Sequence, residues 1–247
     1  MNLDFFKTRR TVRSFSTDDP GIEKISEMID AAAHAPNTGN MQTVAAIITS
    51  DPAIKEKLSP LHFGQPCVVQ APYIITFCAD FNRFGQWCSL RNASPGFDNL
   101  QGLLAAVIDA SMFAQQFCTI AEQNGLGGVF LGTTLYNAGQ IASVLELPDR
   151  VIPVITMAVG IPSDDCPAGP TPRLPLRSVL HMQKYQLFDD KEIDSLYAEL
   201  ESAASSRQFI TENNKETLAQ VFTDVRYPRE SAEAFSESLA KYLSLYL

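Results

Sequence analysis

Residues 98–124, DNLQGLLAAVIDASMFAQQFCTIAEQN, are followed directly by residues 125–132, GLGGVFLG. The first segment repeats apolar residues at helical spacing without an internal proline, so it predicts one long helix. Because little of its circumference is polar, we expect this helix to be buried in the core or at a subunit interface. Gly125 supplies a left-handed stop, and residues 128–132 then predict a strand or extended segment.

Shorter periodic segments lie on both sides of this pair. Residues 20–34 predict a helix that Asp18 or Asp19 caps. We further expect buried strands at 43–49, 73–79 and 151–160, short helices from Asp51 and over 137–145, irregular chain at 81–97, a loop at 162–175, and helical stretches over 189–247. Strands separated by helices at uneven spacing indicate a mixed α and β domain.

Composition excludes several classes of function. The 247 residues carry 28 acidic and 19 basic side chains, a formal net charge of −9, which argues against nucleic-acid binding. Five cysteines without CxxC spacing favour reduced thiols in a cytosolic protein. We find no leader-like segment and no uninterrupted apolar run of about 18 residues. We therefore expect a soluble, cytoplasmic protein that binds neither nucleic acid nor membrane.

A cluster of arginines stands out in this acidic chain. Arg9, Arg10 and Arg13 lie within five residues, and a second cationic element, Pro172-Arg-Leu-Pro175, lies far along the chain. Guanidinium groups bind phosphate oxygens through planar, paired donors. We interpret Arg173 and the N-terminal arginines as a clamp on the phosphate of a small cofactor. A solvated helix end is the alternative, and the arginine run by itself does not decide between them.

Two further segments offer groups for a flat ligand. The loop at 37–42 carries four hydrogen-bonding side chains, Asn37, Thr38, Asn40 and Gln42, although a plain turn explains them nearly as well. The glycines of residues 125–132 do not fit the dinucleotide-binding template, because its third glycine falls on Phe130 and a helix precedes the strand. They leave exposed backbone beside Gly128 and Gly132, and close packing is the more common explanation.

Hydrolytic and metal sites find little support. The three histidines are scattered, and no GxSxG or zinc-ligand spacing is present. We expect Asp80 to cap a turn at a strand end, and Cys78 to be packed in an apolar strand. We therefore assign no acid–base catalytic side chain and no metal ligand.

Six segments, in order, resemble the nitroreductase–flavin reductase family, and specifically its oxygen-insensitive, NADPH-dependent branch. The matching segments are Arg9-Arg-Thr-Val-Arg13, Ala35-Pro-Asn-Thr-Gly-Asn-Met-Gln42, Phe77-Cys-Ala-Asp-Phe-Asn-Arg83, Asp109-Ala-Ser-Met-Phe-Ala-Gln115, Gly125-Leu-Gly-Gly-Val-Phe-Leu-Gly132 and Pro172-Arg-Leu-Pro175. The resemblance covers roughly residues 3 to 185, and the last sixty residues match only loosely.

The resemblance implies an α+β homodimer with a nitroreductase-like mixed sheet flanked by helices and a long central helix at the dimer interface. It implies an FMN-binding domain over residues 1–185 and a C-terminal helical excursion over 186–247, packed on the same domain or on the partner subunit. One FMN per subunit would lie at the interface. The residues implied to contact it are Arg9, Arg10, Thr11, Arg13, Asn37, Thr38, Asn40, Gln42, Gln65, Phe130, Leu131, Gly132 and Arg173, those at 130–132 through their backbone.

The activity implied is an NAD(P)H-dependent FMN oxidoreductase that works by a ping-pong mechanism. Hydride would pass from NADPH or NADH through flavin N5 to a small-molecule electron acceptor, namely a nitroaromatic compound, a quinone or free flavin. Two departures from the family pattern stand out. Thr171 replaces a common lysine, and only Arg207 and Lys215 are available in the excursion to read an NADPH 2′-phosphate.

Three alternatives stay open at the level of sequence. The chain could be a flavin-fragmenting or dehalogenating member of the superfamily, with residues 81–97 as a lid over the flavin. It could be a non-catalytic protein that binds FMN or another phosphorylated metabolite. A purely structural interaction protein is the third.

Overall fold

The computed structural model describes residues 3–166, 169–170 and 172–244. The chain forms two compact units. The first, which we call the sheet unit, comprises Arg10–Ala168 and Phe235–Leu247, and the second, the helical unit, comprises Met1–Arg9 and Gly169–Ala234. The expected boundary between 185 and 186 stays a prediction.

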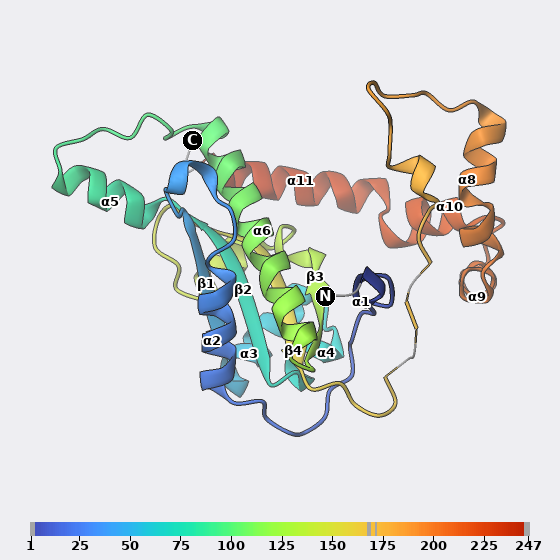
Figure 1. Ribbon diagram of the computed structural model, residues 1–247, viewed down its shortest axis with the longest axis horizontal. Helices are drawn as coiled ribbons and strands as arrows, with labels where there is room; N and C mark the ends of the chain where they lie inside the picture. Colours follow the sequence, from blue (N-terminus) through green and yellow to red (C-terminus); the bar gives the residue numbers. More distant parts are fainter. Residues whose placement is uncertain (1–2, 167–168, 171, 245–247) are drawn as a thin grey trace. The chain divides into compact units, whose positions relative to one another are not determined.

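The sheet unit is built on four strands, shown in Figure 1: β1 (Val44–Thr49), β2 (Tyr73–Asp80), β3 (Gly127–Leu131) and β4 (Val151–Gly160). Their order is β1-β2-β4-β3, and each neighbouring pair is antiparallel, where a mixed sheet was expected. The physical reason is the long helix α6 (Leu100–Gln123), which brings the chain back to the end of the sheet where β2 began. β3 therefore runs in the direction of β2, but β4 lies between them and opposes both.

Side chains of the two central strands alternate between two apolar clusters. Tyr73, Ile75 and Phe77 of β2 pack in the cluster formed with α6 and α2 (Ile22–Ala32), whereas Ile74 packs on the opposite face. That second face is covered by α3 (Pro52–Leu58), α4 (Pro66–Gln70) and α7 (Ala138–Val144), so helices lie on both sides of the sheet (Figure 1). Burial on both faces explains why these strands are continuous apolar runs in the sequence.

Helix α6 confirms the central prediction, with its ends as expected within two residues. Its inner face, including Leu103, is buried, and it ends where Gly125 adopts a φ of 81° and the Leu126 N–H donates to Ala121 O at 2.9 Å. Its outer face is apolar yet exposed, with Ile108 58% accessible. By length and composition alone α6 could cross a membrane, a property that core helices of soluble proteins share.

Two local expectations were wrong. Residues 81–97 are not irregular throughout, because α5 (Asn82–Leu90) forms there. Its first turn is held by Asp80 Oδ1, which accepts a hydrogen bond from the Arg83 N–H at 3.0 Å, so Asp80 caps as expected. Helix α2 begins at Ile22, and Asp19 Oδ1 accepts instead from Gly21 N–H and from the Tyr73 hydroxyl, both at 2.8 Å.

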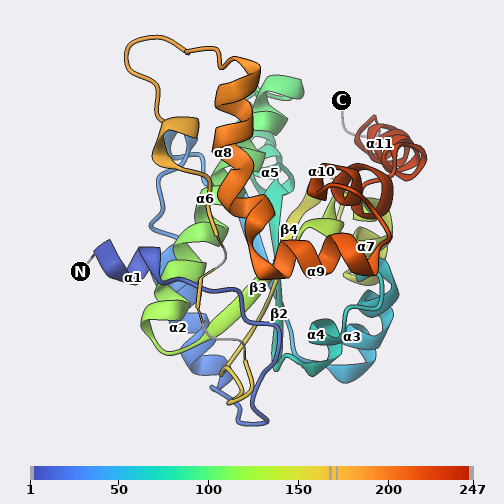
Figure 2. The ribbon, with the colours of Figure 1, turned by 90° about the vertical axis from the view of Figure 1, so that its right-hand side faces the viewer.

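The helical unit contains α1 (Leu3–Lys7), α8 (Asp190–Ser202), α9 (Ala204–Glu212), α10 (Leu218–Gln220), a π-helical turn η5 (Val221–Arg226), and the first residues of α11 (Arg229–Leu243). Figure 2 shows α8, α9 and α10 following one another along the chain. Asp189 and Glu192 form a capping box at the start of α8. The helical stretches expected after residue 189 are therefore confirmed.

Phe77 offers a test of the core. Its ring meets Phe113 edge-on at 5.2 Å between centroids and is fully buried, so Phe77→Ala leaves a cavity between β2 and α6. We expect a loss of about 3–5 kcal/mol in the free energy of unfolding, measured by urea denaturation. Phe77→Leu, which retains most of the apolar volume, should cost about 1 kcal/mol. Equal losses for the two variants would contradict this packing.

Candidate cofactor site

The arginine run lies directly beside strand β3. The Val12 N–H donates to Gly128 O at 3.1 Å, and the Val12 side chain is buried over the strand. This approach is close because Gly127 has no side chain: a Cβ there would overlap Val12. Arg10 and Arg13 flank Val12, so the hydrogen bond places both at the edge of the sheet.

Arg10 and Arg13 are held in different ways at this edge. Arg10 Nη1 donates to Cys166 O at 3.3 Å, which ties it to the chain beyond β4. Arg13 is exposed, and its charge acts on the Cys67 thiol: burial raises the pKa of Cys67, and Arg13 partly opposes that rise. Arg13 therefore lies within electrostatic reach of the turn that carries Gln65.

That turn is joined to the end of β3. The 3₁₀ turns η2 (Ser59–His62) and η3 (Gly132–Thr134) meet where His62 Nδ1 and Thr133 Oγ1 lie 2.7 Å apart. Gln65 Nε2 donates to His62 O at 3.1 Å. The structure thus brings together residues 10–13, the turn at 62–65 and residues 128–133, which we call the β3-edge patch.

Within this patch the two glycines singled out by sequence differ. A Cβ at Gly128 would meet Ala158 O at 2.5 Å, so Gly128 is explained by close packing. A Cβ at Gly132 would find no atom within 4 Å. Phe130 is half-buried against the α6 side and Leu131 is buried on the opposite face. The backbone beside Gly132 is therefore open to a flat ligand, as a cofactor ring would require.

The polar loop belongs to a second patch. Thr38 donates from its N–H and its hydroxyl to the two oxygens of Asp109, at 2.9 and 3.0 Å, and Asp109 is only 1% exposed on α6. Asn37 Oδ1 accepts from the Gln42 N–H, and Asn40 Oδ1 accepts from Gln42 Nε2. Asn37, Gln42 and Asp109 line a cavity of about 310 Å³, which we call the β1-edge patch.

The two patches lie at opposite edges of the sheet. The polar loop leads into β1, whereas the other patch surrounds the end of β3, and β2 and β4 lie between them. Three steps of about 4.8 Å between strands put these edges roughly 14 Å apart. Residues 37–42 of one chain are therefore not brought together with residues 10–13 and 130–132 of the same chain.

Other predicted contacts lie outside the sheet unit. Arg9 and Arg173 belong to the helical unit, so the full arginine clamp stays a prediction. Thr11, by contrast, lies in the sheet unit. Thr171 lies outside the described residues.

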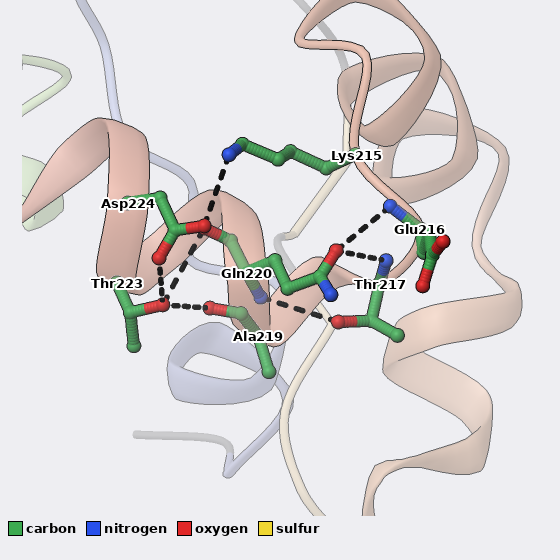
Figure 3. A network of polar contacts seen from close by, with 7 residues as sticks. All are labelled: Lys215, Glu216, Thr217, Ala219, Gln220, Thr223 and Asp224. Carbon is green, nitrogen blue, oxygen red and sulfur yellow. Dashed lines mark hydrogen bonds and ion pairs between the residues drawn. The ribbon is translucent and has the colours of Figure 1, made fainter.

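The candidates for a 2′-phosphate also have partners within the helical unit. Lys215 Nζ pairs with Asp224 at 2.9 Å, as Figure 3 shows, and Arg207 Nε donates to Ser202 O at 2.8 Å. A phosphate would have to compete with these interactions.

Sequence reasoning missed three residues that position the patches. Asp109 holds the polar loop, Arg83 donates to Val44 O at 3.0 Å beside it, and His62 joins two turns. The aspartate within an otherwise apolar helix was the available signal for Asp109, because a buried carboxylate requires hydrogen-bond donors. Cys78, as expected, is packed, and burial raises its pKa to about 12.

Comparison with known proteins identifies the fold and the family. A family model described as the nitroreductase family matches residues 6–161. The chain belongs to the nitroreductase family. It is therefore an oxidoreductase, and the family resemblance and the α+β fold class are confirmed.

Individual relatives extend this result. A Salmonella typhimurium protein named oxygen-insensitive NADPH nitroreductase is 38% identical over 183 residues, 74% of this chain and 73% of the relative. The crystal structure of a Bacteroides fragilis protein is 42% identical, with a TM-score of 0.95 over 98% of both chains, so the likeness includes the C-terminal helices. An NADPH:FMN oxidoreductase from Vibrio harveyi, solved with NAD⁺, shares the fold at 24% identity, with a TM-score of 0.73 over 93% of this chain and 96% of that one.

The different surroundings of Gly127 and Gly132 can be tested by measuring the stability of alanine variants. Gly127→Ala forces a Cβ into Val12 and should cost about 1–3 kcal/mol of unfolding free energy, because the β3 edge and the arginine run must separate. Gly132→Ala is the matched control, and it should leave thermal stability unchanged or slightly raised. Equal melting temperatures for both variants would show that the close approach of Val12 is not needed.

Proposed function

We propose that this oxidoreductase binds FMN, takes hydride from NADPH or NADH, and reduces a nitroaromatic compound, a quinone or free flavin in alternating half-reactions. The observation that carries the proposal is the hydrogen bond from Val12 to Gly128, which holds the segment with Arg10 and Arg13 against β3, the strand that leads to the open backbone at Gly132. The names of the Salmonella and Vibrio proteins support NADPH as donor and FMN as cofactor.

The residues of the β3-edge patch fit the cofactor. Arg10 and Arg13 supply charged, planar donors for its phosphate. The open backbone at Gly132 can receive the flat ring. FMN bound there supplies the electron-transfer chemistry, which no acid–base side chain of the protein has to provide. Cations and backbone N–H groups would stabilise negative charge on the ring.

We further propose that the active form is a homodimer paired through α6. The outer face of α6 carries an apolar stripe, Leu100, Leu104, Ile108 and Met112, which is 36–58% exposed. Such a stripe at i, i+4 spacing is typical of a helix with a missing partner. A second copy would also allow the polar loop of one chain to reach the β3-edge patch of the other, which a single chain does not achieve.

The first test is a spectrum of the purified protein. We expect a yellow protein that bleaches anaerobically with NADPH or NADH and recovers with nitrofurazone. Arg10→Ala and Arg13→Ala should each weaken FMN binding about 10- to 100-fold, because each removes a charge-assisted hydrogen bond. Arg229→Ala, an exposed arginine of α11, is the control. Colourless wild-type protein that gains no flavin from excess FMN would refute the proposal.

The second test concerns the dimer. Light scattering at micromolar concentration should give twice the chain mass, and the double variant Leu104→Glu with Ile108→Glu should give a monomer. A charge buried without a partner at an interface is strongly unfavourable. Ala31→Glu, on the exposed side of α2, should leave the mass unchanged. A monomeric wild-type protein would rule out this pairing.

A further inference from the structure

His62 is a buried imidazole that the proposed function does not yet use. Its side chain is 0% exposed, and its Nδ1 lies 2.7 Å from Thr133 Oγ1. Its Nε2 is buried and has no hydrogen-bond partner among the described residues. One ring nitrogen is thus paired with a hydroxyl at the edge of the candidate site, and the other is buried without a hydrogen-bond partner among the described residues.

The unpaired nitrogen decides which tautomer is present. If Nε2 carried the proton, a buried N–H donor would have no acceptor, which is rare in proteins because the lost hydrogen bond is costly. If Nδ1 carries it, Nε2 keeps only a lone pair, which is less costly to bury. We therefore infer that Nδ1–H donates to Thr133 Oγ1. Burial also lowers the pKa of His62 to about 4, so the ring is neutral at pH 7.

This tautomer leaves the Thr133 proton available. The Thr133 hydroxyl accepts from His62, and no other hydrogen bond of this hydroxyl is formed within the described residues. Its neighbour behaves differently: Thr134 Oγ1 donates to Leu131 O at 2.8 Å and is buried. Thr133 is half-buried and follows Gly132, whose surroundings are open. Its hydroxyl proton can therefore point to a ligand at that backbone.

We propose that Thr133 is a binding residue that donates a hydrogen bond to an acceptor atom on the edge of the flavin ring, and that His62 is the positioning residue that orients its hydroxyl. This inference rests on the proposed FMN function and assigns two residues beyond the predicted contact set. The His62 carbonyl oxygen also accepts a hydrogen bond from the Gln65 side chain. The same turn would therefore position both the Thr133 hydroxyl and the Gln65 amide beside the flavin ring.

The tautomer can be measured without any flavin. The chain has three histidines, so ¹⁵N-histidine labelling gives few NMR signals, and His62→Leu identifies the one from His62. We expect a neutral ring protonated at Nδ1 at pH 7, in the FMN-free and FMN-bound protein alike. A ring protonated at Nε2 would overturn the role assigned to His62.

The hydroxyl is tested by FMN titration, with flavin fluorescence and the visible spectrum as readouts. Thr133→Val, which keeps the shape and removes the donor, should weaken FMN binding about three- to tenfold and shift the flavin absorption band. Thr133→Ser should bind within about twofold of wild type. Unchanged affinity and spectrum in Thr133→Val would overturn the proposal.

The role of His62 is tested by replacing it with asparagine and with glutamine, whose side-chain amides lie at different distances from the backbone. In His62→Asn the amide can occupy the place of Nδ1 and should retain affinity, whereas His62→Gln places it nearer to Nε2 and should resemble Thr133→Val. Because His62 acts through Thr133, the double variant Thr133→Val with His62→Gln should be no weaker than either single variant. Additive losses, or failure of His62→Asn to retain affinity in a folded protein, would contradict this coupling.

The same titration separates the two proposals. Wild-type protein that binds FMN while Thr133→Val binds it equally well overturns this inference and leaves the proposed function intact. Wild-type protein that binds no FMN overturns the proposed function, and this inference with it.

Discussion

The hydrogen bond from Val12 to Gly128 is the interaction on which the candidate site depends. It is possible because Gly127 carries no side chain, so a second extended segment can lie against the edge of β3. This single approach places two arginines beside β3, in a chain whose net charge is −9. The local positive charge of these arginines is suited to a phosphate even though the chain as a whole is acidic.

The antiparallel order of the sheet then determines what one chain can build. Because β1 and β3 are the two edges, the polar loop before β1 and the open backbone after β3 are separated by two strands. The apolar outer face of α6 is a further surface that one chain leaves exposed. Both features have the same explanation in the proposed dimer, where a second copy covers the stripe and supplies the missing half of the site.

Buried polar groups position both halves. Asp109 holds Thr38 from within the apolar helix α6, and His62 holds Thr133 from a 3₁₀ turn. In each case the hydrogen bond ties a polar loop or turn to a group whose own position is fixed by burial. A buried carboxylate without donors, or a buried imidazole without an acceptor, would destabilise the fold, and the cost of breaking these bonds keeps the loops in place.

Local sequence patterns determined much of the architecture: the apolar strands, the long helix with its Gly125 stop, the helical stretches after residue 189 and the six family segments could all be read from neighbouring residues. Helix α5 was missed because residues 81–97 hold Gly, Pro, Asn and Ser, which favour turns, and because its first turn depends on Asp80. Only the tertiary structure distinguished the packed Gly128 from the open Gly132, and only it paired Thr38 with Asp109 and His62 with Thr133. Each of those pairs joins residues 71 positions apart, and periodicity, which reports on neighbours a few residues away, carries no information about contacts made across a folded sheet.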